Sequence, residues 1–420
     1  MDTEEKQAAS RFCGALRYLR GFLTWVTAGL VLGLAGGLAG GAFSLAVKAV
    51  TDFRGSHGWV IWLLPAGGLL IAFLYHNKFF HPTDTNGVLL TLHGERAFDM
   101  STAPVIFFSA VLSHLLGASV GREGAALQLG GELGNGLVRL LHVKREARDG
   151  LIMCGMSAVF AALFGTPLAA AFFAIEVASV GLLHYSAIVP CLTSAFTAVR
   201  VAELLGAEGD AFPIWREISF RGGSIAAVIA VAALCGGMSI LYCLSFRGGE
   251  HLAKKYLPNP YLRIAVGGAV LIVLTLIFGA DYNGAGMGMV ERAVAGEARP
   301  EAFAIKLLFT VVSVSAGFKG GEIVPCLFIG STLGCTASQL LGLDPALGAA
   351  VGLLAMFCGS LNCPISSILL GAELFGTANL YFFAIACAVS YMLSANYSLY
   401  HEQKLLYSKF RAERIDGYTE

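Results

Sequence analysis

The sequence predicts an all-α polytopic membrane protein built from two related halves. Of its 420 residues, 56% are hydrophobic and 13% are charged, whereas a soluble domain has roughly 25% charged residues. Apolar runs follow one another along almost the whole chain, and Gly or Pro interrupts many of them. Similar segments recur about 200 positions apart. Together these features favour tilted and broken helices in a bilayer, where the 52 glycines let helices pack closely.

Composition also argues against several other classes of protein. The formal net charge is +0, which gives no basis for a nucleic-acid partner. The ten cysteines lack C-x-x-C spacing and the nine histidines lack H-x-x-x-H spacing, so we expect no metal and no cofactor. Neither a nucleophile–base pair nor a phosphate-binding loop stands out. We therefore expect a protein that is not an enzyme.

The charged ends of the chain indicate its orientation. Arg17 and Arg20 precede the first apolar run, and Lys404 and Lys409 follow the last one. Positive charge beside membrane helices marks the cytoplasmic side, so both termini should be cytoplasmic. The expected divisions are a cytoplasmic N-terminal segment (1–20), a first membrane repeat (21–205), a linker (206–222), a second membrane repeat (223–397) and a C-terminal helix and tail (398–420).

The two halves share four blocks in the same order. The blocks of the first half are Asn86-Gly87 with Glu95–Ala97; Val111, Ser113, Gly117 and Gly121; Gly130, Leu133 and Gly134; and Pro167 with Glu176. They recur as Asn283-Gly284 with Glu291–Ala293; Val311, Ser313, Gly317 and Gly321; Gly330, Leu333 and Gly334; and Pro364 with Glu373. Identity alone leaves open whether the halves are inverted or parallel. Repeats with broken helices usually hold their substrate where the halves meet, with helix N-termini facing an anion. The pattern therefore predicts an anion site.

Two glycine-rich stretches, 121–130 and 320–325, each place a glutamate at the start of an apolar helix. Glu123 either occupies the anion's place and swings away when protonated, or caps its own helix in an aqueous vestibule. Ionisable groups at membrane depth are expensive and tend to be functional, which favours the first interpretation. Glu322 carries the same two alternatives. Two carboxylates at one anion site would provide two proton-binding groups in series.

Four other polar residues stand out within or beside apolar runs. Glu176 and Glu373 each follow a proline by nine residues, which indicates a structural role such as closing a helix end or bonding a neighbouring loop. Lys306 either pairs with a carboxylate or extends its ammonium to the membrane surface. Tyr407 either points into an anion pathway or belongs to the interfacial belt of tyrosines.

These residues resemble motifs of the CLC family of chloride channels and anion/proton antiporters. The stretch 121–124 is similar to the family's G-[KR]-E-G-P motif, with Ala125 in place of the proline, and 164–176 is similar to the short helix after its N-A-P-L turn. The stretch 404–408 resembles its K-P-L-Y-S segment. The resemblance covers about residues 15–412. It implies the CLC fold with two inverted-topology repeats, and a homodimer in contact through about 168–200 and 365–395.

Three departures from the chloride-transporting pattern resemble the fluoride-exporting branch of that family. Asn86 takes the place of the serine in G-S-G-I-P, and Glu322 introduces a carboxylate into the G-x-F-x-P motif. Val177 stands where the chloride antiporters have an internal proton glutamate. This likeness implies that Glu123 is the proton-carrying gate and Glu322 a second proton site. It implies anion contacts from Asn86, Gly87, Gly121, Arg122, Gly124, Gly321, Ile323, Val324 and Tyr407.

The resulting expectation is a fluoride/proton antiporter of the bacterial inner membrane that exports fluoride from the cytoplasm. Fluoride is small, strongly hydrated and a strong hydrogen-bond acceptor. An asparagine NH₂, a tyrosine OH and helix N-terminal N–H groups are suitable donors for it. Its partners would be fluoride, protons, the lipid bilayer and a second copy of the chain. The alternative is a chloride/proton antiporter or chloride channel of the same family.

Overall fold

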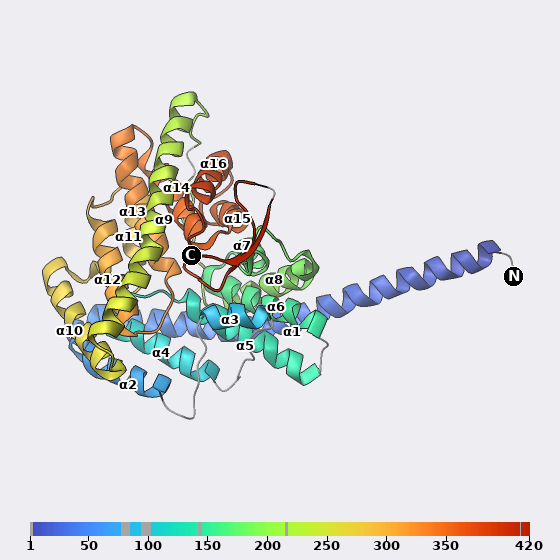
Figure 1. Ribbon diagram of the computed structural model, residues 1–420, viewed down its shortest axis with the longest axis horizontal. Coiled ribbons are helices and arrows are strands. Elements are labelled where there is room, and N and C mark those ends of the chain that lie inside the picture. The colour runs from blue at the N-terminus through green and yellow to red at the C-terminus, as the bar shows by residue number, and fades with distance from the viewer. Residues whose placement is uncertain (1–2, 77–84, 94–101, 142–144, 215–216, 412) are drawn as a thin grey trace.

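The computed structural model describes residues 3–76, 85–93, 102–141, 145–214, 217–411 and 413–420. The predicted repeat block Glu95–Ala97 lies outside these residues. Nearly all of the described chain is helical, as the apolar pattern predicts, and the helices pack into one body from which the N-terminal part of the first helix projects (Figure 1).

The first half contains a long helix followed by shorter, tilted ones. Its helices are α1 (Thr3–Ser56), η1 (Gly58–Leu63), α2 (Leu64–His76), α3 (Thr85–Leu92), α4 (Ala103–Leu116), α5 (Glu123–Leu141), α6 (Arg145–Phe164), α7 (Pro167–Glu176), η3 (Tyr185–Ala187) and α8 (Ile188–Leu204). Several begin where the sequence has Gly or Pro, because Pro fits the first turn of a helix and Gly permits a sharp change of direction.

The second half repeats this order. Its helices are α9 (Gly222–Tyr256), α10 (Pro260–Phe278), η4 (Ala280–Tyr282), α11 (Met287–Val294), α12 (Ala302–Ala316), α13 (Ile323–Leu341), α14 (Pro345–Leu361), α15 (Pro364–Phe375) and α16 (Leu380–Leu393). Thus α3 to α8 correspond one by one to α11 to α16, and the long helix α1 corresponds to α9.

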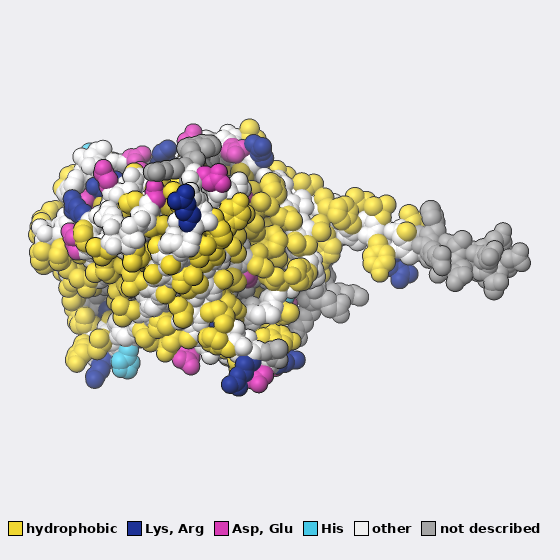
Figure 2. Space-filling view, turned by 90° about the horizontal axis from the view of Figure 1, so that it is seen from above, with side chains coloured by type: hydrophobic (Ala, Val, Ile, Leu, Met, Phe, Trp, Pro, Cys, Tyr) yellow, Lys and Arg dark blue, Asp and Glu magenta, His cyan; other side chains and the backbone are white. Residues whose placement is uncertain are grey.

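The helices have the lengths and surfaces of a protein that crosses a bilayer. Seven of them in the described chain are long and apolar enough to span it. Hydrophobic side chains cover most of the face seen in Figure 2, while charged side chains gather along its upper and lower margins. The protein is therefore a multi-pass membrane protein. In the short helices α7 and α15, backbone N–H groups of the first turn find protein partners.

Glycines set the close approach of neighbouring helices in both halves. A methyl group on Gly130 of α5 would lie 2.4 Å from the carbonyl oxygen of Gly155 in α6. A methyl group on the equivalent Gly330 of α13 would lie 2.4 Å from the carbonyl oxygen of Gly352 in α14. Each pair packs backbone against backbone, which only residues without a side chain allow.

Two glutamates show that the halves are inverted. The Glu176 carboxylate at the end of α7 accepts hydrogen bonds from Ile365 N (3.1 Å) and Ser366 N (2.9 Å) at the start of α15. The Glu373 carboxylate at the end of α15 accepts them from Leu168 N (2.8 Å) and Ala169 N (2.9 Å) at the start of α7. Two equivalent helices whose ends meet in this way run antiparallel. The structural role predicted for both glutamates is confirmed.

The C-terminal segment corrects one expectation, because 398–420 does not form a helix. Lys404–Tyr407 (β2) pairs in parallel with Ser179–Val180 (β1) and antiparallel with Arg414–Tyr418 (β3). Leu405 is buried between two partly buried neighbours, an alternation typical of a strand. The segment is held in this form by backbone bonds to the chain that follows α7, a tertiary partner that a local pattern does not show.

We expect Glu176→Ala and Glu373→Ala each to lower the melting temperature of the detergent-solubilised protein. Each variant leaves two helix N-terminal amides without their acceptor, a loss of ~1–2 kcal/mol. Thermal unfolding followed by fluorescence measures the change. Glu413→Ala is the matched control, because the Glu413 side chain is 67% exposed and its ion pair with Arg411 is 4.0 Å long. Melting temperatures equal to the control's would contradict the capping role.

Candidate functional site

The two halves meet at a pair of glycines. Gly121 N donates to Gly321 O (2.5 Å), and Gly321 N donates to Gly121 O (2.6 Å), which forms an isolated antiparallel bridge. Each glycine comes two residues before the first residue of α5 or α13, respectively. The bridge therefore brings two helix N-termini together, one from each half. Free N–H groups and positive dipole ends make such a place favourable for an anion.

The Glu123 carboxylate fills this place. Its Oε1 accepts a hydrogen bond from Arg122 N (3.0 Å) and its Oε2 accepts one from Val324 N (3.1 Å), so it binds amides from both halves. The residue is fully buried. A methyl group on Gly121 would lie 2.1 Å from Oε2, and one on Gly321 would lie 2.8 Å from it.

Gly121, Gly124 and Gly321 together form what we call the glycine cradle. A methyl group on Gly124 would lie 3.1 Å from both Gly320 O and Gly321 Cα, so this position is also closed to larger residues. The carboxylate is itself an anion held by backbone N–H groups. The cradle is thus shaped for one small anionic group, whether this carboxylate or a free ion.

Arg122 contributes its backbone to the cradle while its side chain points elsewhere. Its guanidinium pairs with Asp210 (2.6 Å) and donates to Ser44 Oγ (3.3 Å). It also lies over the ring of Phe164, 5.6 Å from the centroid. The pair with Asp210 ties the start of α5 to the linker between the halves.

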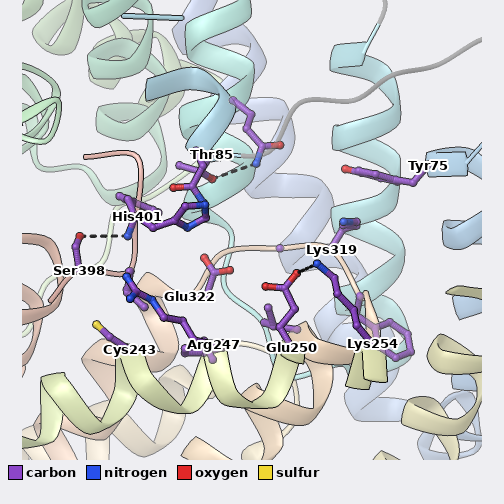
Figure 3. Close-up of a pocket in the computed structure, with 18 residues that line it drawn as sticks. Tyr75, Thr85, Cys243, Arg247, Glu250, Lys254, Lys319, Glu322, Ser398 and His401 are labelled. Atoms are coloured by element: carbon purple, nitrogen blue, oxygen red, sulfur yellow. Dashed lines mark hydrogen bonds and ion pairs between the residues drawn. The ribbon is translucent and has the colours of Figure 1, made fainter. Parts of the chain in front are cut away.

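A cavity of about 440 Å³ reaches Glu322, which stands directly before α13 (Figure 3). The residues that line it come from both halves and from the C-terminal segment: Tyr75, Thr85, Asn86, Gln128, Cys243, Phe246, Arg247, Glu250, Lys254, Val314, Phe318, Lys319, Gly320, Glu322, Ser398, Leu399, Tyr400 and His401. Four of these residues are basic (Arg247, Lys254, Lys319 and His401) and two are acidic (Glu250 and Glu322), so basic groups outnumber acidic ones. Such a lining attracts anions.

Glu322 lines the cavity at the start of α13. It occupies the N-cap position of α13, yet its side chain makes no capping hydrogen bond to that helix. Its backbone carbonyl accepts a hydrogen bond from Tyr242 OH (2.7 Å), which holds the start of α13 in position. The interpretation of Glu322 as a simple cap of α13 therefore does not fit the geometry.

The remaining predicted anion contacts lie in the lining of the cavity or beside the Glu123 carboxylate, except for one residue. Asn86 lines the cavity, and its Oδ1 accepts a hydrogen bond from Glu402 N (3.4 Å). Val324 donates its amide to the Glu123 carboxylate, as described above. Gly87 and Ile323 are buried in α3 and α13 next to these residues. The structure thus brings the predicted set together from α3, α5 and α13, with one exception.

That exception is Tyr407, whose predicted place in the site is corrected by the structure. Tyr407 lies in β2, is 42% exposed and does not line the cavity. Tyr400 lines it instead: this residue is buried, and its hydroxyl has no hydrogen-bond partner in the described part of the chain. Distance along the chain could have distinguished the two. Tyr400 comes seven positions after the end of α16 at Leu393, whereas Tyr407 comes fourteen positions after it.

The expectation for Lys306 is also wrong. Its side chain is fully buried, so the ammonium does not reach the membrane surface. It donates to the backbone carbonyls Tyr282 O (3.0 Å) and Gly284 O (2.7 Å), and it lies 5.1 Å from the centroid of the Phe328 ring. Among the described residues it forms no ion pair with a carboxylate. Backbone carbonyls, which no sequence pattern reveals as partners, take that role.

The sequence is similar to those of known anion channels and transporters. Residues 78–395 match the sequence profile of the voltage-gated chloride channel family. A "Chloride/fluoride channel protein" of Pseudomonas syringae pv. tomato is 35% identical over 91% of this chain and 86% of its own length. The H⁺/Cl⁻ exchange transporter ClcA of Vibrio cholerae serotype O1 is 24% identical over 82% of this chain and 80% of its own length.

Two solved structures share the fold. A CLC-type fluoride/proton antiporter superposes with a TM-score of 0.87 at 30% identity, over 91% of this chain and 98% of its own. A slow cyanobacterial Cl⁻/H⁺ antiporter superposes with a TM-score of 0.77 at 20% identity, over 88% of this chain and 94% of its own. The second likeness concerns the fold alone. These comparisons confirm the resemblance on which the predicted fold rested.

The glycine cradle predicts a steep effect of a single methyl group. Gly121→Ala would place a carbon 2.1 Å from Glu123 Oε2 and should expel the carboxylate from its amides. We expect at least a tenfold loss of anion flux from liposomes, on the scale of ~1.4 kcal/mol or more. Gly237→Ala on α9 is the matched control, because nothing lies within 4 Å of its new carbon. Equal flux in the two variants would show that the fit of the Glu123 carboxylate in the cradle does not matter for anion movement.

Proposed function

The chain belongs to the CLC family of voltage-gated chloride channels and related antiporters, and from this membership we propose that it is a fluoride/proton antiporter. It exports fluoride from the cytoplasm in exchange for protons, with Glu123 as the gate. The observation that carries the proposal is the position of the Glu123 carboxylate, which accepts amide hydrogen bonds from both halves at the glycine cradle.

Competition between the carboxylate and the transported anion provides the coupling. Charge-assisted hydrogen bonds hold the ionised carboxylate against Arg122 N and Val324 N. A proton arriving at Glu123 removes the negative charge and weakens both bonds. The neutral side chain then leaves the cradle, and an anion takes the amides in its place. The anion and the proton thus exclude each other from one set of donors, as exchange in opposite directions requires.

Glu322 is a second proton-binding group, on the cavity side of Glu123. Its carboxylate lines the cavity, and its neighbour Val324 bonds the gate. A proton released by Glu123 can pass to Glu322 and from there to water in the cavity. If one fluoride is exchanged for one proton, a pH difference of one unit, worth ~1.4 kcal/mol, supports about a tenfold fluoride gradient. Proton influx would therefore drive fluoride outward.

The polar residues of the cavity suit fluoride. Asn86 offers an NH₂ group and Tyr400 offers a hydroxyl without a hydrogen-bond partner among the described residues. Fluoride loses a tightly held water shell when it enters a protein, so close N–H and O–H donors must replace that shell. The names of two relatives, a chloride/fluoride channel and a fluoride/proton antiporter, agree with this preference.

The competing proposal is a chloride/proton antiporter or a chloride channel with Asn86 in place of the usual serine. It is favoured by one observation, the similarity to H⁺/Cl⁻ exchangers over most of the chain. Chloride is larger and a weaker hydrogen-bond acceptor, so it has less need of the donors that Asn86 and Tyr400 supply.

One experiment decides between these proposals. Liposomes that contain the purified protein are loaded with fluoride or chloride. After the membrane potential is clamped, fluoride, chloride and pH electrodes follow the release of the anion and the movement of protons. We expect fluoride release to be at least tenfold faster than chloride release, a difference of ~1.4 kcal/mol or more in barrier height, with protons moving the opposite way. Faster chloride release would favour the competing proposal.

The gate and the relay are tested in the same assay. Glu123→Ala should abolish proton movement, because no carboxylate remains to exchange places with the anion. Glu322→Ala should slow coupled exchange strongly while the protein stays folded. The exposed Glu413→Ala is the control for loss of a carboxylate. Undiminished proton movement in Glu123→Ala would refute the assignment of Glu123 as the gate. Normal exchange in Glu322→Ala would refute the assignment of Glu322 as a proton relay.

Two tyrosines provide a matched pair of variants. Tyr400→Phe removes the hydroxyl at the cavity, and we expect it to raise the fluoride concentration for half-maximal exchange about fivefold to tenfold, the worth of one hydrogen bond. Tyr407→Phe removes an exposed hydroxyl from β2 and should change nothing. Initial fluoride flux as a function of concentration measures both. The reverse ranking would restore Tyr407 as the anion-coordinating residue.

We also propose that the protein is a homodimer in the bacterial inner membrane, with both termini in the cytoplasm. Large apolar side chains are exposed where the interface is expected: Tyr185 (65%), Phe196 (50%) and Tyr381 (59%). Arg17 and Arg20 at the start of the chain support the orientation. Each subunit holds a complete cradle and cavity, so each would transport on its own.

A further inference from the structure

The loop between α16 and β2, which carries Tyr400, is held by hydrogen bonds to two distant parts of the chain. Leu399 N donates to Ser360 O (2.9 Å), near the end of α14. Ser398 N donates to Glu420 O (3.0 Å), beyond β3. Tyr400 N donates to Ser398 Oγ (3.1 Å) within the loop itself. The backbone of Tyr400 is therefore placed by the membrane helices on one side and by the C-terminal segment on the other.

The carbonyl oxygen of Tyr400 accepts two hydrogen bonds. One comes from Gln403 N (3.0 Å), three residues further along, and closes a turn. The other comes from the hydroxyl of Thr419 (2.9 Å), directly after β3. Thr419 N donates in turn to Gln403 O (3.0 Å). Thr419 thus bonds both ends of the turn that begins at Tyr400.

The far end of this turn is anchored in the membrane helices through the side chain of Gln403. That side chain is fully buried. Its Nε2 donates to Val177 O (2.9 Å) and to Leu361 O (2.8 Å), at the ends of α7 and α14. Its Oε1 accepts a hydrogen bond from Asn362 Nδ2 (3.1 Å). Gln403 is therefore a fixed point, and Thr419 holds Tyr400 relative to it.

The strand β3 leads to Thr419 although the strand buries little surface of its own. Four of its five residues are exposed and the fifth is partly buried. Stabilisation by apolar burial scales with the area removed from water, so β3 contributes little of it. Thr419, in contrast, is only 6% exposed, and its hydroxyl is directed at the Tyr400 loop. The contacts of this segment point to a role in that loop.

The position of the Tyr400 hydroxyl depends on the backbone that carries it. The hydroxyl is buried at the cavity and has no hydrogen-bond partner in the described part of the chain. A tyrosine side chain has two rotatable torsions, so its oxygen follows the movement of its Cα closely. A binding group has to be placed to within about 0.5 Å by the groups around it. Here the hydrogen bonds to the backbone of Tyr400 provide that control.

We propose that Thr419 is a positioning residue for anion transport: its hydroxyl holds the Tyr400 carbonyl and so keeps the Tyr400 hydroxyl in place at the cavity. The inference rests on the proposed role of Tyr400 as a donor to the anion. Thr419 is not among the residues that line this cavity, so it acts through Tyr400. Without the Thr419 hydroxyl, Tyr400 O keeps its bond from Gln403 N. The turn then persists but is held less firmly, and the anion binds more weakly.

The test is a double-mutant cycle in liposomes, with initial fluoride flux measured as a function of concentration. Thr419→Val keeps the shape of the side chain and removes its hydroxyl. We expect it to raise the concentration for half-maximal flux about threefold, within the worth of one hydrogen bond. In the Tyr400→Phe protein, Thr419→Val should have no further effect, because the group that it positions is already absent. Thr419→Ser restores the hydroxyl and should match the wild type.

Thr24→Val is the matched control, because the exposed Thr24 hydroxyl donates to Arg20 O within its own helix. It should leave the concentration for half-maximal flux unchanged. Should Thr419→Val fail to fold, Thr419→Ala takes its place in the cycle, and Thr419→Ser remains the comparison.

A purely structural role of Thr419 would give a different result. Thr419→Val would then lower the melting temperature and leave the concentration for half-maximal flux unchanged, or would raise that concentration by the same factor with and without the Tyr400 hydroxyl. Either outcome overturns the proposal. Faster release of chloride than of fluoride would overturn the proposed function alone, because the same cycle can be measured with chloride.

Discussion

The reciprocal backbone bridge between Gly121 and Gly321 is the contact on which the rest of the structure depends. A helix N-terminus has N–H groups without intrahelical partners, and inside a membrane these groups need an acceptor. Here α5 and α13 present such groups to each other, and the Glu123 carboxylate supplies the acceptor. Because a Cβ at either glycine would meet Glu123 Oε2, neither position tolerates a side chain. The same geometry that satisfies the amides makes a place for an anion.

The broken helices around this bridge are stabilised by the same means. Glu176 and Glu373 each cap the first turn of the other's helix, so α7 and α15 end where their partners begin. A carboxylate at a helix N-terminus compensates both the free N–H groups and the dipole. The halves are thus joined three times by anion-to-amide contacts, once at the centre through Glu123 and twice at the α7–α15 pair. The glutamate at the centre differs in that its carboxylate contacts amides of both halves.

Basic groups occur in the cavity and also near the end of α1, with different surroundings. The cavity places Arg247, Lys254 and Lys319 around an opening that contains Glu322. On the far side Arg54 and Lys306 hold backbone carbonyls, and no carboxylate of the described chain joins them. Pseudo-symmetry accounts for the likeness of the two sides, since each half contributes one Asn-Gly pair.

The sequence by itself determined the membrane class, the repeat, the glycines of the cradle and both glutamates of the site. Each depends on residue type and spacing: apolar runs report bilayer helices, and a glutamate beside glycines before such a run reports a helix start in a polar pocket. Only the tertiary structure decided that the halves are inverted, that Tyr400 rather than Tyr407 faces the cavity, that 404–407 is a strand, and that Lys306 binds carbonyls. These features depend on which backbone groups from distant segments meet. Nearly every residue type has the same backbone groups, so the sequence does not show which of them will be partners.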